Sequence, residues 1–293
     1  MEVKKAVIPI AGLGTRFLPL SKILPKEVWP LVDKPVIQYI VEEARASGIK
    51  EIIFVDRPDK KEVREYFQKY LKKIPELEAI LKMRKKNHLL GELKNLEKIT
   101  KNISFSYIFQ KMPLGDGHAI LQAEKLIKNE PVAVLFGDDV VASKTPCLLQ
   151  LIKVFKKYQL PLISLHRLPR ERLPFYGIVG VKKVSKQVYQ IKKIVEKPAI
   201  AQAPSNLAIV GKYILTPEVF KYLKRNKFNE GKEIILADTL KKMLLAGSKV
   251  YGYEFEGKWL ECGNKLAYLK SNLYLSLKHP QFGKELKKFL IKL

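Results

Sequence analysis

Apolar runs alternate with amphipathic stretches through the first part of the chain. Residues 5–10 (KAVIPI) form a short apolar run that predicts a buried strand, and a glycine-rich turn follows it directly. Residues 35–47 show helical spacing, with Pro35 at the start and Gly48 as a stop signal. The run EIIFV at 51–55 predicts a second strand. A strand, a glycine loop, a helix and a strand in this order are typical of a parallel α/β unit.

The alternation continues and then changes character. The pattern predicts a lysine-rich helical region at 60–100, strands at 104–109, 131–139 and 161–168, and helices at 118–127 and 153–158. Beyond residue 170, short strand-like runs follow each other closely, before helices at 217–225 and 233–246, a strand in KVYGYEFEG and two C-terminal helices. No linker or repeat divides the chain. We therefore expect one domain over 1–293, with an α/β part to about 145, a β-rich part from about 146 to 265, and helices from about 266 to 293.

Composition excludes several classes of protein. With 47% apolar residues in 293, the chain is globular rather than disordered. Two cysteines, Cys147 and Cys262, exclude a disulfide scaffold and a multi-cysteine zinc site, and they favour a reducing compartment. No stretch of about 18 uncharged apolar residues is present to cross a membrane. The run after Lys4 and Lys5 faintly resembles a signal peptide, but it is short and contains Pro9. We expect a cytoplasmic protein without a membrane partner.

The net charge of +26, from 55 Lys and Arg against 29 Asp and Glu, raises the possibility of nucleic-acid binding. The lysines are densest at 60–101 and 278–292, where they alternate with apolar residues at helical spacing. Such spacing is typical of solvated helix faces. No helix-turn-helix, zinc-finger or RNP motif accompanies the charge. We therefore expect no nucleic-acid partner, and a basic nucleic-acid-binding protein remains an alternative that charge alone supports.

The first motif with chemical content is Gly12-Leu13-Gly14-Thr15-Arg16, directly after the first predicted strand. Glycines let the backbone approach an anion, and consecutive N–H groups then bind phosphate. Arg16 adds a planar cation suited to phosphate oxygens, and Lys26 follows ten residues later. The alternative is an ordinary turn between a strand and a helix. The two nearby cations favour phosphate.

A second motif, Gly137-Asp138-Asp139, follows the strand at 131–139. Ligands of open α/β sheets bind at the carboxyl ends of strands, where a carboxylate can hold Mg²⁺ on nucleotide phosphates. Taken alone, this motif is more typical of a turn or a helix cap.

A third motif joins Glu196-Lys197-Pro198 with the segment YGIV at 176–179. Glu196 offers an acceptor for sugar hydroxyls, and Lys197 offers a cation for a phosphate. The alternative is an exposed ion pair.

Glu261 precedes Cys262 at the end of another predicted strand. Cys262 suggests a nucleophile, but none of the four histidines stands in a pattern that marks it as the base. Covalent catalysis is therefore disfavoured.

Taken in series, these segments resemble the bacterial UTP–glucose-1-phosphate uridylyltransferases of the sugar-nucleotidyltransferase family over about residues 5–275. The matching segments, in order, are AGLGTRFLP, PKEVWPLVDKPVIQYIVEEA, QKMPLGDGHAI, GDD, YGIV, EKP, APSNLAIVGKYIL and GKEIILADTL. Each is weak alone, and their order makes the resemblance specific. It implies a Rossmann-like mixed β-sheet flanked by helices, with a small β-rich region over the sugar site.

The resemblance also implies roles for residues of the first part of the chain. Nucleotide binding falls to the glycine loop and to QKMPLGDGHAI at 110–120, which resembles the family's base-recognition segment. The residues are Ala11, Gly12, Gly14, Thr15, Gln110 and Gly115. Arg16 and Lys26 would bind the triphosphate. Asp138 would be the main Mg²⁺ ligand.

In the second part, the resemblance implies that Gly177, Glu196 and Asn206 hold glucose hydroxyls and that Lys197 binds the sugar phosphate. Glu261 would be the second metal ligand. Arg16, Lys26, Asp138 and Lys197 would form the catalytic set. The expected reaction transfers UMP from UTP to glucose 1-phosphate with Mg²⁺ as cofactor, in a homodimer or homotetramer.

Several positions depart from the family pattern. Residue 261 is Glu where the family usually has Asp, and the added methylene puts the second metal ligand in doubt. Trp259 and Leu260 replace more polar residues, GKEIILADTL differs at Lys232, Ile235 and Ala237, and Asp56-Arg57 is unusual after the second strand. The same chemistry with another base or sugar, for example with dTTP, and a non-catalytic sugar-nucleotide sensor therefore remain alternatives.

Overall fold

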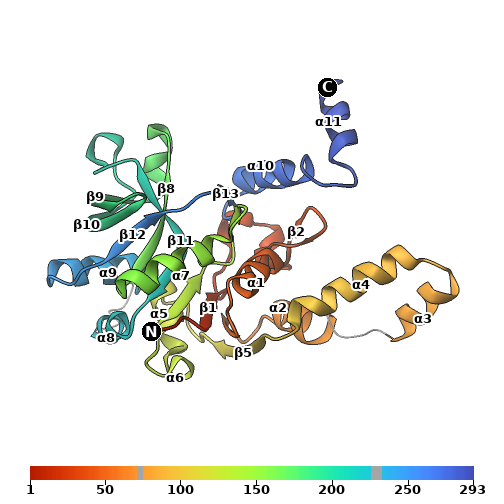
Figure 1. The fold of residues 1–293 in the computed structure, drawn as a ribbon, viewed down its shortest axis with the longest axis horizontal. Coiled ribbons are helices and arrows are strands. Elements are labelled where there is room, and N and C mark those ends of the chain that lie inside the picture. The colour runs from red at the N-terminus through yellow and green to blue at the C-terminus, as the bar shows by residue number, and fades with distance from the viewer. Residues whose placement is uncertain (71–74, 226–232) are drawn as a thin grey trace.

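A nine-stranded β-sheet runs through the centre of the protein, and helices cover both of its faces (Figure 1). This computed structural model describes residues 1–70, 75–225 and 233–293. From one edge to the other, the strands are β5 (Ser104–Phe109), β4 (Glu51–Asp56), β1 (Lys5–Pro9), β6 (Val132–Leu135), β11 (Leu207–Leu215), β8 (Leu162–Arg167), β12 (Tyr251–Glu254), β10 (Val188–Glu196) and β9 (Gly177–Ser185). The expected mixed α/β sheet is confirmed.

The first four strands are parallel, with Lys5 of β1 opposite Glu51 of β4. Their sequences are nearly continuous apolar runs because both faces of a parallel sheet are covered. In β1, Ala6 and Ile8 pack into one layer and Val7 packs into the other. The first layer contains α1 (Val36–Ala46) and α7 (Cys147–Tyr158), and the second contains α5 (Asp116–Gln122), α8 (Pro217–Arg225) and α9 (Leu236–Leu245).

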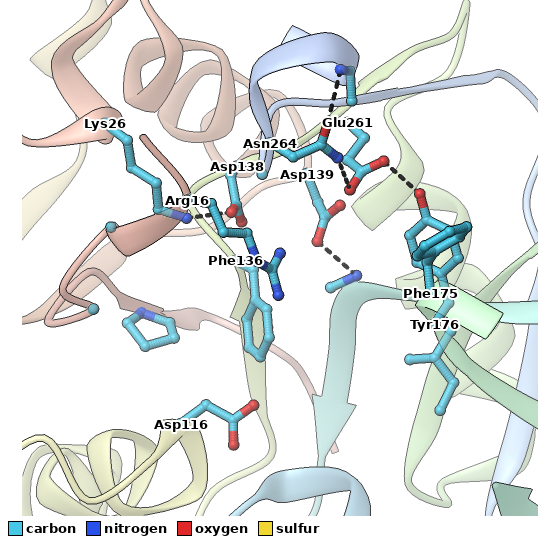
Figure 2. A pocket seen from close by; sticks show the side chains of 18 of the residues that line it. Arg16, Lys26, Asp116, Phe136, Asp138, Asp139, Phe175, Tyr176, Glu261 and Asn264 are labelled. Carbon is cyan, nitrogen blue, oxygen red and sulfur yellow. Dashed lines mark hydrogen bonds and ion pairs between the residues drawn. The ribbon is translucent and has the colours of Figure 1, made fainter. Parts of the chain in front are cut away.

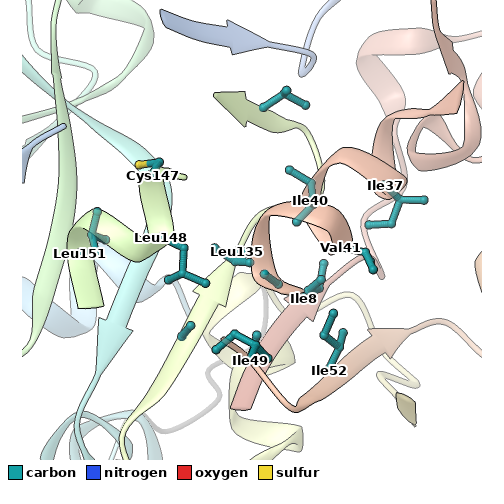
Figure 3. Packing of buried hydrophobic residues seen from close by; sticks show 14 of the residues in the cluster. Ile8, Ile37, Ile40, Val41, Ile49, Ile52, Leu135, Cys147, Leu148 and Leu151 are labelled. Carbon is teal, nitrogen blue, oxygen red and sulfur yellow. The ribbon is translucent and has the colours of Figure 1, made fainter. Parts of the chain in front are cut away.

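The apolar side of α1 explains its position against the sheet. The buried residues recur at helical spacing, and they are Val36, Ile37, Ile40, Val41 and Ala44. Figure 3 shows Ile37, Ile40 and Val41 gathered above Ile8 of β1. Each aliphatic side chain of this kind stabilises the fold by about 1.5–3 kcal/mol on full burial. The helix ends at Ala46, and Gly48 takes a φ of +90° that an L side chain rarely adopts.

The second part of the sheet is richer in antiparallel pairing. β11 runs antiparallel between β6 and β8, and β9 and β10 pair antiparallel to each other. β9 also pairs with β11, with Ala208 opposite Ile178, so this part of the sheet curls back on itself. The β-rich region that the sequence predicts is therefore present.

A small antiparallel pair stands outside the main sheet. It joins β7 (Asp139–Ala142) to β13 (Lys258–Glu261), with Glu261 opposite Asp139 in register. This pairing brings the two predicted carboxylate motifs together, although residues 143–257 separate the two strands in the sequence. A second short pair joins β2 (Pro30–Leu31) to β3 (Lys34–Pro35).

The remaining helices lie at the periphery. They are α2 (Glu62–Glu65) with a π-helical turn at Tyr66–Tyr70, α3 (Pro75–Met83), α4 (Asn87–Thr100), α6 (Glu124–Ile127), α10 (Lys265–Ser276) and α11 (Gly283–Ile291). Short 3₁₀ turns cover Thr15–Phe17, Leu20–Lys22, Lys26–Val28, Arg170–Phe175 and Ile200–Gln202. In Figure 1, α3 with α4 and α10 with α11 extend away from the sheet. None of the helices in the described ranges is long and apolar enough to cross a membrane.

Some predicted boundaries were wrong. The strand expected at 131–139 stops at Leu135, and a separate strand, β7, begins at Asp139. Between them, the Phe136 N–H still donates to Gly211 O at 2.7 Å, next in register to the Leu135–Lys212 pair of β6 and β11. The helix expected at 118–127 is two helices, α5 and α6. The helix expected at 153–158 already begins at Cys147, after Pro146. The one expected at 233–246 begins at Leu236.

Candidate active site

A cleft of about 1440 Å³ opens at the carboxyl ends of β1 and β6 and reaches across to β9, β10 and β13. It gathers nearly all of the predicted site residues, namely Ala11, Gly12, Gly14, Thr15, Arg16, Lys26, Gln110, Gly115, Asp138, Gly177, Glu196, Lys197 and Glu261. These come from both parts of the chain. The position agrees with the rule that open α/β sheets bind ligands beyond the carboxyl ends of their strands.

The glycine loop has a fixed backbone. Gly14 takes a φ of +65°, and the 3₁₀ turn Thr15–Phe17 follows it. The Lys60 ammonium donates to Gly12 O at 2.8 Å and to Ile10 O at 3.2 Å, so it holds two carbonyls of the loop from outside. Sequence reasoning missed Lys60, since nothing local in a lysine-rich segment distinguishes it.

Arg16 extends from this loop into the cleft (Figure 2). Within residues 1–70, 75–225 and 233–293, no hydrogen bond or ion pair engages its guanidinium. A permanently charged fork without a protein partner is suited to phosphate oxygens.

Gln110 is oriented by two neighbours in the base-recognition segment. Its Nε2 donates to Gly115 O at 2.9 Å and lies 2.8 Å from His118 Nδ1. Burial lowers the pKa of His118, which keeps the ring neutral and able to accept. Both amide hydrogens of Gln110 are thereby used. Its Oε1 has no partner in the described part of the chain and remains available to a donor on a ligand.

Gly115 is required by its surroundings. Its φ is +96°, and a Cβ there would lie 2.6 Å from Ile234 O. The Gly117 N–H donates to the same carbonyl at 2.8 Å, and the Asp116 carboxylate accepts from Leu236 N at 2.9 Å. The start of α9 and the residue Ile234 before it are thus tied to the base-recognition segment.

Lys26 and Asp138 form an ion pair in the wall of the cleft (Figure 2). Burial disfavours the charged form of each group, but the opposite charge next to it outweighs burial. The pKa of Asp138 is therefore lowered and that of Lys26 is raised. Arg16 lies near enough to contribute to the lowered pKa of Asp138. Both groups are charged at neutral pH, and a divalent cation or a phosphate can exchange for either partner.

Asp139 has a different environment from Asp138. Its Oδ2 accepts from Gly211 N at 3.0 Å and its Oδ1 accepts from Trp259 Nε1 at 2.7 Å. Burial, reinforced by the negative charge of Asp138, raises the pKa of Asp139 to about 7. A Cβ at Gly211 would collide with its Oδ2. Asp139 therefore serves mainly to join β7, β11 and β13.

Glu261 lies across the cleft from Lys26. Its Oε2 accepts from Tyr176 Oη at 2.5 Å and from Arg172 Nη2 at 3.2 Å, and its Oε1 accepts from Asn264 Nδ2 at 3.1 Å. Glu261 and Asp138 both border the space beside Gly263. A Cβ on Gly263 would lie 3.1 Å from Asp138 Oδ2 and 3.7 Å from Glu261 Oε1.

The donor set of the cleft fits a hard divalent cation. No group of three or more His, Cys, Asp or Glu side chains in the described ranges could hold a metal alone. Mg²⁺ usually takes one or two carboxylates and completes its shell with water and substrate phosphates. Asp138 and Glu261 supply two carboxylates that border the same point of the cleft. They fit Mg²⁺ in the presence of a nucleotide.

Gly177, Glu196 and Lys197, which the resemblance assigns to the sugar phosphate, line the cleft near β9 and β10. Glu196 pairs with Gly177 in the β9–β10 register, and a Cβ at Gly177 would lie 2.9 Å from Glu196 Oε2. Lys197 has a φ of +46°, an uncommon value for a non-glycine residue, and its N–H donates to Tyr176 O at 3.1 Å. Strained backbone at a cleft residue is a feature of functional sites.

Asn206 does not line the cleft. It precedes β11, and its Oδ1 accepts from Arg167 Nη1 at 2.5 Å. The cleft is lined instead by Ile209, Gly211 and Tyr213, which share one face of β11 because side chains alternate along a strand.

Other lining residues were not expected from sequence. They include Asp116, Phe136, Phe175, Glu233 and Trp259. Among the departures from the family pattern, Ile235 and Ala237 also line the cleft, and Lys232 lies outside the described residues. Asp56 does not line it, but its backbone O accepts from Gln110 N at 2.7 Å.

Comparison with known proteins decides the family. The model of the nucleotidyl transferase family matches residues 5–276. This chain belongs to the nucleotidyl transferases. A UTP–glucose-1-phosphate uridylyltransferase of Staphylococcus haemolyticus is 42% identical over 289 residues, which are 99% of this chain and 98% of that protein. One from Staphylococcus epidermidis is 41% identical over the same share of both chains. The resemblance inferred from the motifs is confirmed.

Solved structures agree with this membership of the nucleotidyl transferases. A UTP-bound UGPase from Acinetobacter baumannii superimposes with a TM-score of 0.87 at 37% identity and covers 99% of both chains. A UDP-glucose pyrophosphorylase complexed with UDP-glucose gives 0.83 at 36% identity, over 94% of this chain and all of that one.

Proposed function

We propose that this nucleotidyltransferase transfers UMP from UTP to glucose 1-phosphate and releases pyrophosphate. The observation that supports this most is the cleft itself, which lines up a fixed glycine loop, the Lys26–Asp138 pair and the Glu196–Lys197 motif. Full-length relatives at 41–42% identity carry the corresponding name. The chain covers essentially the whole of those relatives, so the proposal concerns the complete reaction rather than a single binding step.

The nucleotide end of the cleft takes UTP. Ala11, Gly12 and Gly115 offer backbone groups to the uracil edge, and Gln110 Oε1 accepts from a ring N–H. Backbone N–H groups at Gly14 and Thr15 face the phosphates, with Arg16 and Lys26 as the cations. A site of this kind separates a pyrimidine from a purine better than uracil from thymine, which differ by one methyl group worth about 1–3 kcal/mol.

The sugar end takes glucose 1-phosphate. Glu196 accepts from sugar hydroxyls above Gly177, where only a hydrogen atom leaves room for Glu196 Oε2. Lys197 has no protein partner for its ammonium within the described residues and binds the phosphate.

The chemistry follows from charge. A phosphate monoester oxygen is anionic near neutral pH, so it can attack the α-phosphorus of UTP in line without a strong general base. The work of the site is to bring two anions together and to orient them. Arg16, Lys26 and Lys197 surround the reacting phosphates with positive charge. No nucleophilic side chain is needed, which agrees with the buried Cys262, whose pKa is raised by burial.

Mg²⁺ held by Asp138 and Glu261 would neutralise the phosphates and stabilise the charge that develops on the leaving pyrophosphate. Asp138 is ionised and available once Lys26 turns to a phosphate. We further propose that the protein works as a homodimer or homotetramer in the cytoplasm, on the basis of the family resemblance.

A substrate panel tests the proposal. Pyrophosphate release is measured with Mg²⁺ while UTP, dTTP, CTP and ATP are each crossed with the 1-phosphates of glucose, galactose and N-acetylglucosamine. We expect strong release with UTP and glucose 1-phosphate, and weaker release with dTTP. Binding of UTP without release from any pair would instead support a sugar-nucleotide sensor. Binding of nucleic acid with steep salt dependence and no competition by UTP would support the charge-based alternative.

A further inference from the structure

Glu261 is held by three side chains from two separate segments, namely Arg172, Tyr176 and Asn264. Figure 2 shows the contacts of Tyr176 and Asn264. Tyr176 and Arg172 come from the turn before β9, and Asn264 comes from the start of α10. All three donate to the carboxylate, and none accepts from it. A surface glutamate with one ion pair would keep many rotamers, whereas this one has both oxygens engaged.

The three donors are shared unequally between the two oxygens of the carboxylate. Tyr176 and Arg172 both donate to Oε2, which fixes that oxygen on the side of β9. Only Asn264 donates to Oε1, at 3.1 Å. Oε1 also borders the space beside Gly263 that Asp138 Oδ2 borders, since a Cβ on Gly263 would lie 3.7 Å from the first oxygen and 3.1 Å from the second. One oxygen is therefore anchored, and the other is presented to the cleft with lone-pair capacity remaining.

The orientation of the Asn264 amide follows from the helix it begins. Asn264 is the N-cap of α10, and its Oδ1 accepts from Ala267 N at 2.9 Å. With Oδ1 committed to the helix, the Nδ2 group is the end that faces Glu261. For Tyr176, the hydroxyl carries a proton at neutral pH and the carboxylate can only accept, so the contact at 2.5 Å is a donation from Tyr176 Oη.

We propose that Tyr176 and Asn264 are positioning residues that aim Glu261 Oε1 at Asp138, so that the longer side chain completes a two-carboxylate site for a divalent cation. The inference rests on the proposed function for its nucleotide, and it explains how Glu can stand where the family usually has Asp. Groups that hydrogen-bond to a metal ligand typically affect metal affinity by about 10–100-fold when removed.

A second glutamate outside the cleft also accepts from one arginine and one tyrosine, as Glu261 does, and it provides a matched control. Glu254 accepts from Tyr189 Oη at 2.8 Å and from Arg167 Nη2 at 3.0 Å. Neither Glu254 nor Tyr189 lines the cleft. Tyr189→Phe therefore removes an equivalent hydroxyl from an equivalent Arg–Tyr–Glu contact, at a place where no metal is expected.

The test uses Mn²⁺ as the probe, in the full-length protein with UTP present. Free Mn²⁺ is followed by electron paramagnetic resonance, which reports binding without turnover. Tyr176→Phe and Asn264→Ser are each expected to weaken Mn²⁺ binding by about 10-fold or more. Serine retains the N-cap of α10, so Asn264→Ser removes the donor without removing the cap. Tyr189→Phe is expected to leave the affinity unchanged.

A second comparison separates positioning from a general loss of structure. In a Glu261→Asp background, the shorter carboxylate no longer reaches Tyr176, so adding Tyr176→Phe should change Mn²⁺ affinity less than 2-fold. Equal effects of Tyr176→Phe in both backgrounds, or no effect on the native protein, would overturn the inference. Weaker Mn²⁺ binding in the cleft variants supports it even when the native protein releases no pyrophosphate, a result that would overturn the proposed reaction alone.

Discussion

Asp138 and Asp139 are adjacent in the chain, yet their carboxylates have opposite pKa shifts. Asp138 faces Lys26 in the cleft and its pKa is lowered, whereas Asp139 faces Gly211 and Trp259 and its pKa is raised by burial to about 7. Pairs of carboxylates with divergent environments usually have divergent roles. Here one carboxylate is available to the reaction and the other holds three strands together.

Substitution of Asp138 should therefore abolish turnover without unfolding the protein. We expect Asp138→Ala to lower kcat by about 10³-fold, the scale on which a group that stabilises the transition-state charge contributes. Circular dichroism should remain native. Pyrophosphate release under saturating substrates checks the prediction, and near-native activity would remove Asp138 from the mechanism.

Lys197 combines function with backbone strain, and two substitutions separate these. Lys197→Ala and Lys197→Gly should both raise KM for glucose 1-phosphate, because each removes the ammonium. Only glycine relieves the φ of +46°. Lys197→Gly should therefore be more stable than Lys197→Ala, by up to about 1 kcal/mol. Initial rates against glucose 1-phosphate and urea unfolding measure the two effects. An unchanged KM would contradict the assignment of Lys197.

A buried ion pair joins β11 of the central sheet to α1. Lys212 of β11 lies 2.8 Å from Glu43 of α1, and both side chains are almost fully buried. Removing one partner of such a pair leaves an uncompensated charge and costs about 3–5 kcal/mol. Lys212→Met should therefore lower the free energy of unfolding by that amount. Adding Glu43→Gln should recover much of it, since Gln retains an acceptor for the Leu148 N–H. A mild effect of Lys212→Met alone would show that the pair is hydrated.

Asp56 predicts a dependence of stability on pH. Burial raises its pKa to about 7 in the folded protein from an ordinary value of 3.8. The folded state therefore holds a proton that the unfolded state releases between about pH 4 and 7, so this group's stabilisation is present below pH 4 and is lost as the pH rises through 7. Asp56→Asn keeps the acceptor for Arg57 N. We expect it to be more stable than the native protein above pH 7 and to show a flatter profile. Urea unfolding at pH 5 and pH 8 tests this.

Sequence alone predicts the parts of the fold that are local. The spacing of apolar residues predicts β1 and the amphipathic α1, and the glycines predict the loop between them. The structure confirms all three. The positions that failed depend on contacts between distant segments. β7 has only four residues, and its pairing with β13 could not be inferred from either segment alone.

The candidate site shows the same division. Motifs placed Arg16, Lys26 and Asp138 in one cleft, and the family resemblance selected Asp138 rather than Asp139 as the metal ligand. The structural role of Asp139 could not be predicted, because its partners Gly211 and Trp259 come from distant segments. Asn206 was assigned to the sugar side, yet it lies before β11 and bonds to Arg167. The hydrogen bonds from Tyr176 and Asn264 to Glu261 join the turn before β9 to the start of α10. No local sequence pattern predicts a contact between these distant segments.

The proposed transfer is tested most directly by following a label on the α-phosphate of UTP. Incubated with Mg²⁺ and glucose 1-phosphate, the native protein should place the label in UDP-glucose and form one pyrophosphate for each UDP-glucose. Asp138→Ala should form neither product. Label recovered in UMP or UDP, or UDP-glucose absent while UTP binds, would contradict transfer to the sugar phosphate.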